Sequence, residues 1–282
     1  MTSTQNIIIR DALQEGSQRL IESESPWLDA TLLLGCVTKQ SREKIMASYP
    51  DSIELEVYSS YMSLIEKRAE GYPVAYLTGI KEFFGRDFHV TPGILCPRPD
   101  TEILIEEALK QVHDRAYKRV HDLCTGSGCI ALTLKLENPD LQVSASDLSP
   151  VSEKVFELNR KNLENKDVKF TLSSLLEDIG PPLDLIVSNP PYLTSQETDE
   201  RINRNWKEPS LALDGGEDGL DLIRIIIKDA PPLLNEGGML MIEADPRQMD
   251  EMEQLMKKAG FENIKKICDL ASHERVIMGN LK

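Results

Sequence analysis

The pattern from residue 118 onward constrains the fold most, because short apolar runs alternate with longer stretches of helical spacing. The expected strands cover 118–124, 141–147, 167–172, 183–188 and 237–243. The expected helices cover 128–137, 150–163, 218–231 and 247–259, and two further strands end the sequence. Such alternation is typical of a mainly parallel sheet with helices on both faces, and we therefore predict an α/β fold for this region.

The chain ahead of this region starts with a helical pattern. Residues 6–70 have helical spacing, and Ile9, Leu13 and Leu20 share one face. Later helices are expected to begin at Ser25-Pro26 and to cover 41–47 and 57–69. These features predict a small helical bundle.

A different pattern connects the bundle to the α/β region. Residues 80–96 alternate around Gly85 and predict a β-hairpin. Asp100 or Thr101 can cap the helix that follows. The expected core face of that helix consists of Ile105, Ala108, Leu109 and Val112.

The first strand of the α/β region runs into a glycine-rich turn, residues 122–128, which opens a helix. Glycine permits positive φ and lets the backbone approach a ligand closely. The next strand ends at Asp147, where an acid can accept both hydroxyls of a ribose. Turn and acid together indicate an adenosine-containing ligand, although a plain strand-to-helix turn would have the same pattern.

Two cofactors compete for this turn. Gly126, Gly128 and Ala131 partly fit the dinucleotide fingerprint G-x-G-x-x-G/A, so NAD is a candidate. Asp122, however, lies at the end of the first strand, and a carboxylate repels a pyrophosphate but attracts a sulfonium or an α-ammonium group. The sign of the charge therefore favours S-adenosylmethionine over NAD.

A second apolar strand runs directly into Asn189-Pro190-Pro191-Tyr192. The Asn189 side-chain carbonyl and the Pro190 backbone carbonyl can each accept one N–H of a flat, weakly nucleophilic NH2 group. The prolines fix the backbone, and the tyrosine ring can pack on a planar amide or base. If such a nitrogen receives a methyl group, no general base is needed beforehand, because the proton can leave once the nitrogen is cationic. The alternative is a tight turn without chemistry.

With these motifs the chain resembles the release factor glutamine methyltransferases, the HemK/PrmC family of class I S-adenosylmethionine-dependent enzymes. The matching segments cover 73–79, 82–84, 97–102, 122–128, 189–192, 208–209, 213–220 and 274–276. The segment Pro97-Arg98-Pro99-Asp100-Thr101-Glu102 is more specific than the Asn-Pro-Pro-Tyr motif, which several amino-methylating families share.

The resemblance implies a seven-stranded, Rossmann-like class I methyltransferase sheet with an antiparallel strand near its end. It also implies a helical substrate-docking domain at 1–72, a β-hairpin linker at 73–98 and a methyltransferase domain at 99–282. A bundle of this size could equally serve stability alone. The implied reaction converts S-adenosylmethionine to S-adenosylhomocysteine. Its methyl group goes to the side-chain amide nitrogen (N5) of the glutamine in the Gly-Gly-Gln loop of peptide chain release factors, which supports translation termination.

The family's functional positions map onto named residues. Asn189, Pro190 and Tyr192 would be catalytic. The cofactor would be bound by Asp122, Cys124, Thr125, Gly126, Ser127, Gly128, Asp147, Ser174, Leu175 and Asn189. The substrate would be bound by Asn189, Pro190, Pro191, Tyr192, Arg98 and Glu102. Three positions depart from the family: Cys124 and Asp245 replace glycines and Ser174 replaces an acid. Cys124 must then avoid positive φ or be strained.

Composition bears on the alternatives. The formal net charge is −15, which argues against broad adhesion to nucleic acid. A nucleic-acid amino-methyltransferase would share the Asn-Pro-Pro-aromatic motif, but it would need a basic recognition region, and none is visible. A non-enzymatic adenosine-binding module is the other alternative.

The remaining features indicate a cytoplasmic protein. The five cysteines include no C-x-x-C pair, so free buried thiols in a reducing compartment are expected. The four histidines lack metal spacing, and we expect no metal site. No apolar stretch is long enough for a membrane span, and residues 1–6 lack the basic start of a signal peptide.

Overall fold

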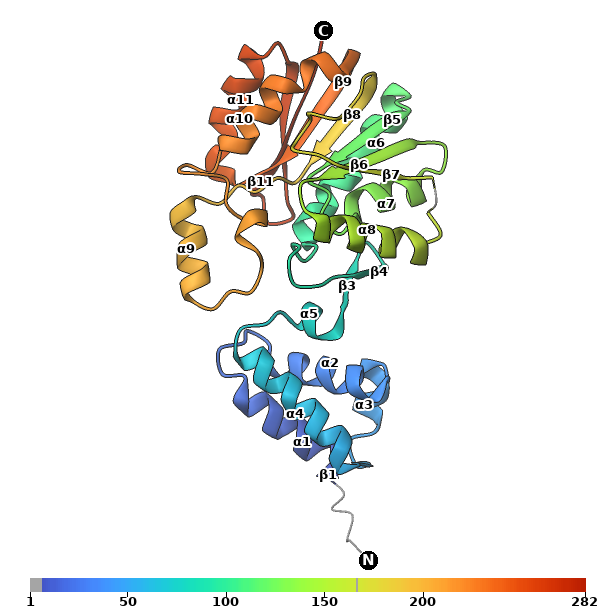
Figure 1. Cartoon of the computed structure of the whole chain (residues 1–282), viewed down its shortest axis with the longest axis vertical. Helices are drawn as coiled ribbons and strands as arrows, with labels where there is room; N and C mark the ends of the chain where they lie inside the picture. The colour runs from blue at the N-terminus through green and yellow to red at the C-terminus, as the bar shows by residue number, and fades with distance from the viewer. Residues whose placement is uncertain (1–6, 166) are drawn as a thin grey trace, which may run out of the picture. The chain divides into compact units, whose positions relative to one another are not determined.

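The computed structural model describes residues 7–165 and 167–282. The chain divides into two compact units (Figure 1). The first runs to Ile80 and takes in Asn203–Lys207, and the second comprises Lys81–Ile202 and Glu208–Lys282. Residues 1–6, where the sequence predicts no signal peptide, lie outside the described part of the chain.

The first unit is a helical bundle, as predicted. Its elements are α1 (Ile9–Arg19), α2 (Pro26–Thr38), α3 (Arg42–Ala47), α4 (Leu55–Ala69), α5 (Val74–Thr78) and the short antiparallel strands β1 (Ile7–Ile8) and β2 (Ser52–Ile53). Ile9, Leu13 and Leu20 are buried together, because they share one face. Pro26 starts α2, but the Ser25 hydroxyl does not cap it and donates to Asp29 instead.

The predicted hairpin is confirmed only in its first part. Strands β3 (Ile80–Phe83) and β4 (Arg86–His89) pair around Gly85, whereas residues 90–98 form no strand. A 3-10 turn, η1 (Pro99–Thr101), leads into α6 (Glu102–Arg115). The expected side-chain cap is absent, since Thr101 occupies the cap position without bonding the helix. The buried side chains of α6 include the predicted Ile105, Ala108 and Val112, and Leu109 is partly buried.

In the described part of the chain, seven strands form one sheet in the order β10-β11-β9-β8-β5-β6-β7. The strands are β5 (Arg119–Leu123), β6 (Gln142–Asp147), β7 (Lys169–Leu172), β8 (Leu183–Ser188), β9 (Leu234–Glu243), β10 (Glu262–Cys268) and β11 (Glu274–Asn280). Strands β9, β8, β5, β6 and β7 are mutually parallel, and β11 is antiparallel to its two neighbours, β10 and β9. The predicted mainly parallel sheet with an antiparallel strand near its end is confirmed.

Helices cover both faces of this sheet (Figure 1). Helix α6 lies with α7 (Cys129–Glu137) and α8 (Pro150–Asn162) on one face, and α10 (Asp221–Asp229) lies with α11 (Met249–Lys258) on the other. Helix α9 (Ser195–Asn203) and the 3-10 turns η2 (Ser210–Ala212), η3 (Pro231–Leu233) and η4 (Pro246–Gln248) lie in the connections. None of the described helices is both long and apolar enough to cross a membrane.

The strand order reverses between β5 and β8. The chain proceeds from β5 to β6 and β7 on one side and returns to β8 on the other. Open α/β sheets bind ligands at the carboxyl ends of strands where the order reverses in this way. Leu123 and Ser188 are paired at that point, and the Ser188 hydroxyl donates to the Leu123 carbonyl at 2.8 Å. The glycine-rich turn and the Asn-Pro-Pro-Tyr motif therefore emerge side by side.

Candidate active site

A cavity of about 530 Å³ opens at the carboxyl ends of β5, β6 and β8, within the size range of small-molecule sites. The predicted cofactor residues Cys124, Gly126, Asp147, Ser174, Leu175 and Asn189 line it. Its apolar wall is made largely by Ile94, Leu95, Leu148, Leu211, Leu222 and Ile225. Asp147 and Asp214 are the charged residues among the described residues of this lining.

Asp122 lies behind the cavity. Its side chain is fully buried, and Oδ2 accepts hydrogen bonds from Thr125 Oγ1 and from Ala131 N at 3.0 Å. Burial raises the pKa of this carboxyl to about 7, against those two hydrogen bonds. Asp122 therefore shapes the turn and does not line the cavity, where the sequence argument placed its charge.

Of the other predicted turn residues, some also lie outside the cavity. Thr125, Ser127 and Gly128 do not line the cavity. Gly128 starts α7 at φ 83°, and a Cβ there would lie 2.6 Å from the Phe156 ring. Gly126 has φ 55° and no atom within 4 Å of a Cβ position. The first glycine therefore keeps the cavity floor open, and the second packs the turn onto α8.

Asp147 connects the turn to the next strand. Its Oδ2 accepts from Gly126 N at 2.8 Å, and its Oδ1 accepts from Ser149 N at 2.9 Å. A carboxylate has about four acceptor positions, so lone pairs remain for a ligand in the cavity. The two backbone bonds fix the carboxylate at the cavity wall.

Two non-glycine residues of the cavity lining have left-handed backbones. Cys124 has φ 61° and Leu175 has φ 47°. The sequence required Cys124 to avoid positive φ or be strained, and the structure places it in the strained region. Burial raises the pKa of the Cys124 thiol, so this cysteine is held in its neutral form.

Asn189 lies between two cavities. It lines the larger one with Pro191, and it lines a smaller cavity of about 140 Å³ with Pro190, Tyr192 and Arg98. Its Nδ2 donates to Thr101 Oγ1 at 3.0 Å. The planar amide therefore turns its carbonyl oxygen away from Thr101, and that oxygen remains a free acceptor among the described residues.

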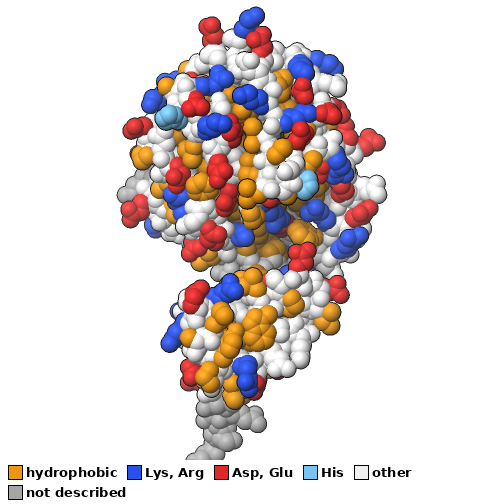
Figure 2. Space-filling view, turned by 180° about the vertical axis from the view of Figure 1, so that it is seen from behind, with side chains coloured by type: hydrophobic (Ala, Val, Ile, Leu, Met, Phe, Trp, Pro, Cys, Tyr) orange, Lys and Arg blue, Asp and Glu red, His pale blue; other side chains and the backbone are white. Residues whose placement is uncertain are grey.

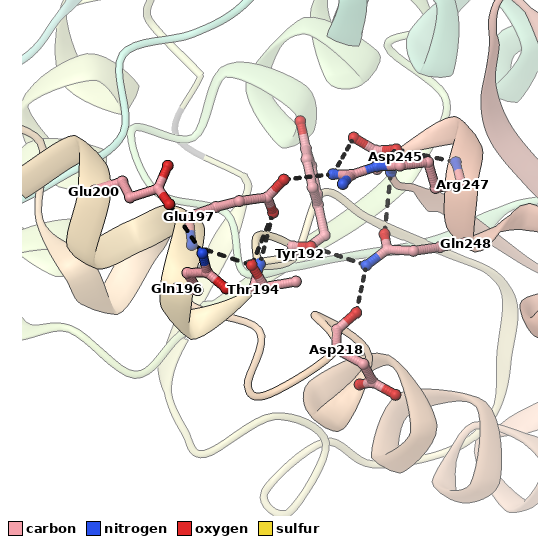
Figure 3. A network of polar contacts seen from close by, with 9 residues as sticks. All are labelled: Tyr192, Thr194, Gln196, Glu197, Glu200, Asp218, Asp245, Arg247 and Gln248. Atoms are coloured by element: carbon pink, nitrogen blue, oxygen red, sulfur yellow. Dashed lines mark hydrogen bonds and ion pairs between the residues drawn. The ribbon is translucent and has the colours of Figure 1, made fainter.

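The loop after Tyr192 is tied to the start of α11 (Figure 3). Gln248 Nε2 donates to the Tyr192 carbonyl at 2.9 Å and to the Asp218 carbonyl at 3.3 Å. Arg247 bridges Asp245 and Glu197 at 2.8 Å each. Hydrogen bonding to Arg247 lowers the pKa of Asp245, and burial raises the pKa of Tyr192 to about 12. Asp245 lines the smaller cavity and not the larger one.

The two other predicted substrate residues have different positions. Arg98 lines the smaller cavity and pairs with the buried Glu208, whose Oε1 accepts from Cys96 N at 2.8 Å. Glu102 lines neither cavity, and its Oε1 accepts from Phe84 N at 2.9 Å. Its side chain therefore holds the hairpin turn.

Sequence reasoning missed several residues around these cavities. They are Thr101 as the partner of Asn189, Glu208 as the partner of Arg98, Gln248, Arg275 and the 209–214 loop. Thr101, Glu208 and Arg275 lay in segments that carried the family resemblance, but Thr101 was interpreted as a helix cap and the other two were given no role.

The cysteines are unpaired, but not all are buried. Cys96 and Cys129 are buried and Cys124 is partly so, whereas Cys36 and Cys268 are exposed. The expectation of uniformly buried thiols is therefore wrong, because spacing does not reveal exposure. Within residues 7–165 and 167–282, no group of three His, Cys, Asp or Glu side chains is placed to hold a metal ion.

Known proteins match the chain along most of its length. The family model described as PrmC N-terminal domain matches residues 11–79, and the one described as methyltransferase small domain matches 94–210. A release factor glutamine methyltransferase from Clostridium acetobutylicum is 36% identical over 96% of this chain and 97% of its own. One from Coxiella burnetii is 37% identical over 96% and 98%.

A solved structure shares the fold of the second unit. The 16S rRNA N2 G1207 methyltransferase of T. thermophilus, in complex with AdoMet and guanosine, has a TM-score of 0.53 at 17% identity. The match covers 72% of this chain and 50% of that chain. At this identity the similarity concerns the fold alone, which is that of a class I methyltransferase.

Proposed function

The chain belongs to the release factor glutamine methyltransferases, and on that premise we propose its reaction in detail. It transfers a methyl group from S-adenosylmethionine to the side-chain amide nitrogen (N5) of the glutamine in the Gly-Gly-Gln loop of peptide chain release factors, and it releases S-adenosylhomocysteine. The observation that carries the proposal is the Asn189 amide, which Thr101 orients and which lies between two cavities.

The larger cavity suits S-adenosylmethionine. Asp147 offers acceptors for ribose hydroxyls, and Gly126 leaves open space where a side chain would project. Its charged lining residues, Asp147 and Asp214, are both acidic. They would repel a pyrophosphate and attract a sulfonium or an ammonium group. The electrostatic argument first made for Asp122 is thus supported by these two residues instead.

The smaller cavity suits the acceptor side chain. The bound cofactor supplies an activated methyl group on a positive sulfur. The Asn189 and Pro190 carbonyls each accept one N–H of the glutamine amide, which turns the nitrogen lone pair toward the larger cavity. The methyl group would pass from the cofactor's sulfur to this nitrogen, which leaves S-adenosylhomocysteine, and one N–H proton of the cationic nitrogen would then pass to solvent. Such positioning is worth on the order of 7–11 kcal/mol at best.

The helical first unit is proposed to dock the protein substrate. Its exposed large apolar side chains include Ile21, Trp27, Leu32, Met46 and Leu55. Figure 2 shows apolar side chains gathered on the surface of this unit. Exposed apolar groups of this kind mark interaction surfaces when they are contiguous.

Methyl transfer from labelled S-adenosylmethionine tests the function. A purified release factor should take up one label, and the same factor with its Gly-Gly-Gln glutamine replaced by alanine should take up none. Labelling of RNA in place of the release factor would favour the nucleic-acid alternative. Cofactor binding without any transfer would favour the binding-module alternative.

A further inference from the structure

A buried carboxyl lies next to Asn189. Ser188 on β8 pairs with Ile242 on β9, so the next residues, Asn189 and Glu243, follow side by side. Met241, two residues before Glu243, and Val187, two residues before Asn189, both belong to the core under α6. Because side chains alternate along a strand, Glu243 is directed to that same face. Thr101, just ahead of α6, covers this point.

Glu243 is incompletely satisfied. It is 2% exposed, as is Thr101, and its Oε2 has no hydrogen-bond partner among the described residues. The Thr101 hydroxyl is close enough to this carboxylate to lower its pKa by hydrogen bonding. A buried acid with an unpaired oxygen costs free energy, and a glutamine or a methionine would pack there without that charge. The mechanism described above gives this acid no role.

The hydroxyl of Thr101 has a single proton, and this sets the direction of the hydrogen bonds. If that proton is donated to the Glu243 carboxylate, the Thr101 oxygen can only accept from Asn189. Nδ2 of Asn189 does donate to that oxygen, at 3.0 Å. The orientation of the Asn189 amide therefore depends on Glu243, because an ionised carboxylate can only accept hydrogen bonds.

We propose that Thr101 and Glu243 are positioning residues that hold the Asn189 carbonyl toward the acceptor amide. The proposal rests on the proposed function. With the amide flipped, Asn189 would present its own NH2 to the NH2 of the glutamine, and two donors would face each other. The hydrogen-bond chain from Asn189 through Thr101 to Glu243 prevents this, and it also withdraws positive charge toward the acid, which makes the Asn189 oxygen a better acceptor.

The protonation state of Glu243 should then affect the rate. Burial raises the pKa of this carboxyl to about 7, and Asp100 also raises it, whereas the Thr101 hydroxyl, Arg275 and Arg98 lower it. The Cys129 thiol on α7 and the Tyr192 phenol also interact with the Glu243 charge. A protonated Glu243 can donate to Thr101, which removes the constraint on the hydroxyl. The rate should therefore rise with pH through the neutral range.

The test compares full-length variants in single-turnover methylation of a release factor at saturating cofactor. Thr101→Val should lower the rate about tenfold to a hundredfold, the scale for partners that orient a ligand, and Thr101→Ser should restore it. Glu243→Gln should lower the rate and flatten the rise with pH. Cofactor affinity should change little in each case. Thr133→Val is the matched control, since Thr133 is fully buried in the same unit with an unpaired hydroxyl.

A second readout needs no substrate. The side-chain amide of Asn189 should show a hydrogen-bonded, slowly exchanging proton by NMR in the wild type and in Thr101→Ser, and lose it in Thr101→Val. An unchanged amide signal in Thr101→Val would overturn the proposal, as would wild-type rates in the folded Thr101→Val and Glu243→Gln variants. Failure of the wild type to methylate any release factor would instead overturn the proposed function, and the NMR comparison would still decide the orientation.

Discussion

At the scale of one residue, substitution of Asn189 distinguishes a catalytic role of the Asn-Pro-Pro-Tyr motif from that of a structural turn. Asn189→Ala removes the acceptor but keeps both prolines and β8. We expect methyl transfer to fall by on the order of a hundredfold or more, by analogy with the loss of one preorganised group. Stability should change by about 1 kcal/mol or less, as for substitutions outside the core. Single-turnover rates and thermal melts measure the two effects, and near-normal methylation by a folded variant would contradict the mechanism.

Cys124 stores backbone strain beside the larger cavity. A non-glycine residue in the left-handed region costs roughly 1–2 kcal/mol, whereas glycine adopts it freely at an entropic cost of about 0.5–1 kcal/mol. Cys124→Gly should therefore leave the free energy of unfolding equal to or slightly above that of the wild type, although a partly buried side chain is lost. Denaturant unfolding measures this. A loss above about 2 kcal/mol would show that thiol packing outweighs strain.

Residue roles were the hardest to predict from the sequence. Asn189 and Asp147, each at the end of a strand, line the larger cavity, and their functional roles stay predictions. Asp122 has the same sequence context as Asp147 but is fully buried, since its carboxylate accepts from its own turn. Thr101 looked like a helix cap, because local spacing cannot show that its oxygen bonds a residue 88 positions away.

The pair of strands β5 and β6 contains a pH-sensitive contact. His121 on β5 is buried, and its ring nitrogens lie 2.9 and 2.8 Å from Ser144 Oγ and Ser146 Oγ on β6. Burial lowers the pKa of His121 from its ordinary value of 6.5 to about 4. The unfolded chain therefore binds this proton more tightly, and stability is lost as pH falls through that window, by roughly 3 kcal/mol at most.

Replacing the histidine isolates this effect. His121→Val should be less sensitive to acid between pH 6.5 and about 4 than the wild type, whatever its absolute stability. Asp122 and Glu243 act with the opposite sign, because their raised pKa values favour the folded state at low pH. Since both acids remain in the variant, the difference between the two pH profiles of unfolding free energy belongs to His121. Parallel profiles would show that the ring does not titrate on unfolding.

Elements were predicted where burial imposes a period. Strand β8 is almost entirely buried, and apolar sequence located the parallel strands β5 to β9 within three residues. Helix α9 was missed, because Thr198 is its one buried residue among those described and its surface is polar. Helix α5 is five residues long, which is too short for helical spacing to emerge.

At the scale of the whole molecule, the chain passes between the two units three times, at 80–81, 202–203 and 207–208. The first unit includes Asn203–Lys207, which starts at the last residue of α9, and Lys207 Nζ lies 5.5 Å from the centroid of the Tyr72 ring. A Cβ on Gly71 would lie 2.5 Å from the Asn205 carbonyl. Deleting the first unit would thus also expose a segment that follows the Asn-Pro-Pro-Tyr motif, so surface substitutions test docking more cleanly than truncation.

Charging the exposed apolar side chains of the first unit should separate docking from chemistry. Met46 and Leu55 are 48% and 54% exposed, so Met46→Glu and Leu55→Glu should fold normally. If this surface binds the release factor, the variants should raise KM for the intact factor by about tenfold, or ~1.4 kcal/mol, with kcat nearly unchanged. A short peptide containing Gly-Gly-Gln should be methylated as before, because it reaches only the cavities beside Asn189.

Leu158→Glu on α8, which is 44% exposed, is the matched control in the other unit. An unchanged KM for the intact factor in both first-unit variants would show that these side chains do not bind the release factor. An equal loss of activity on the peptide would show that the substitutions disturb the second unit instead of docking.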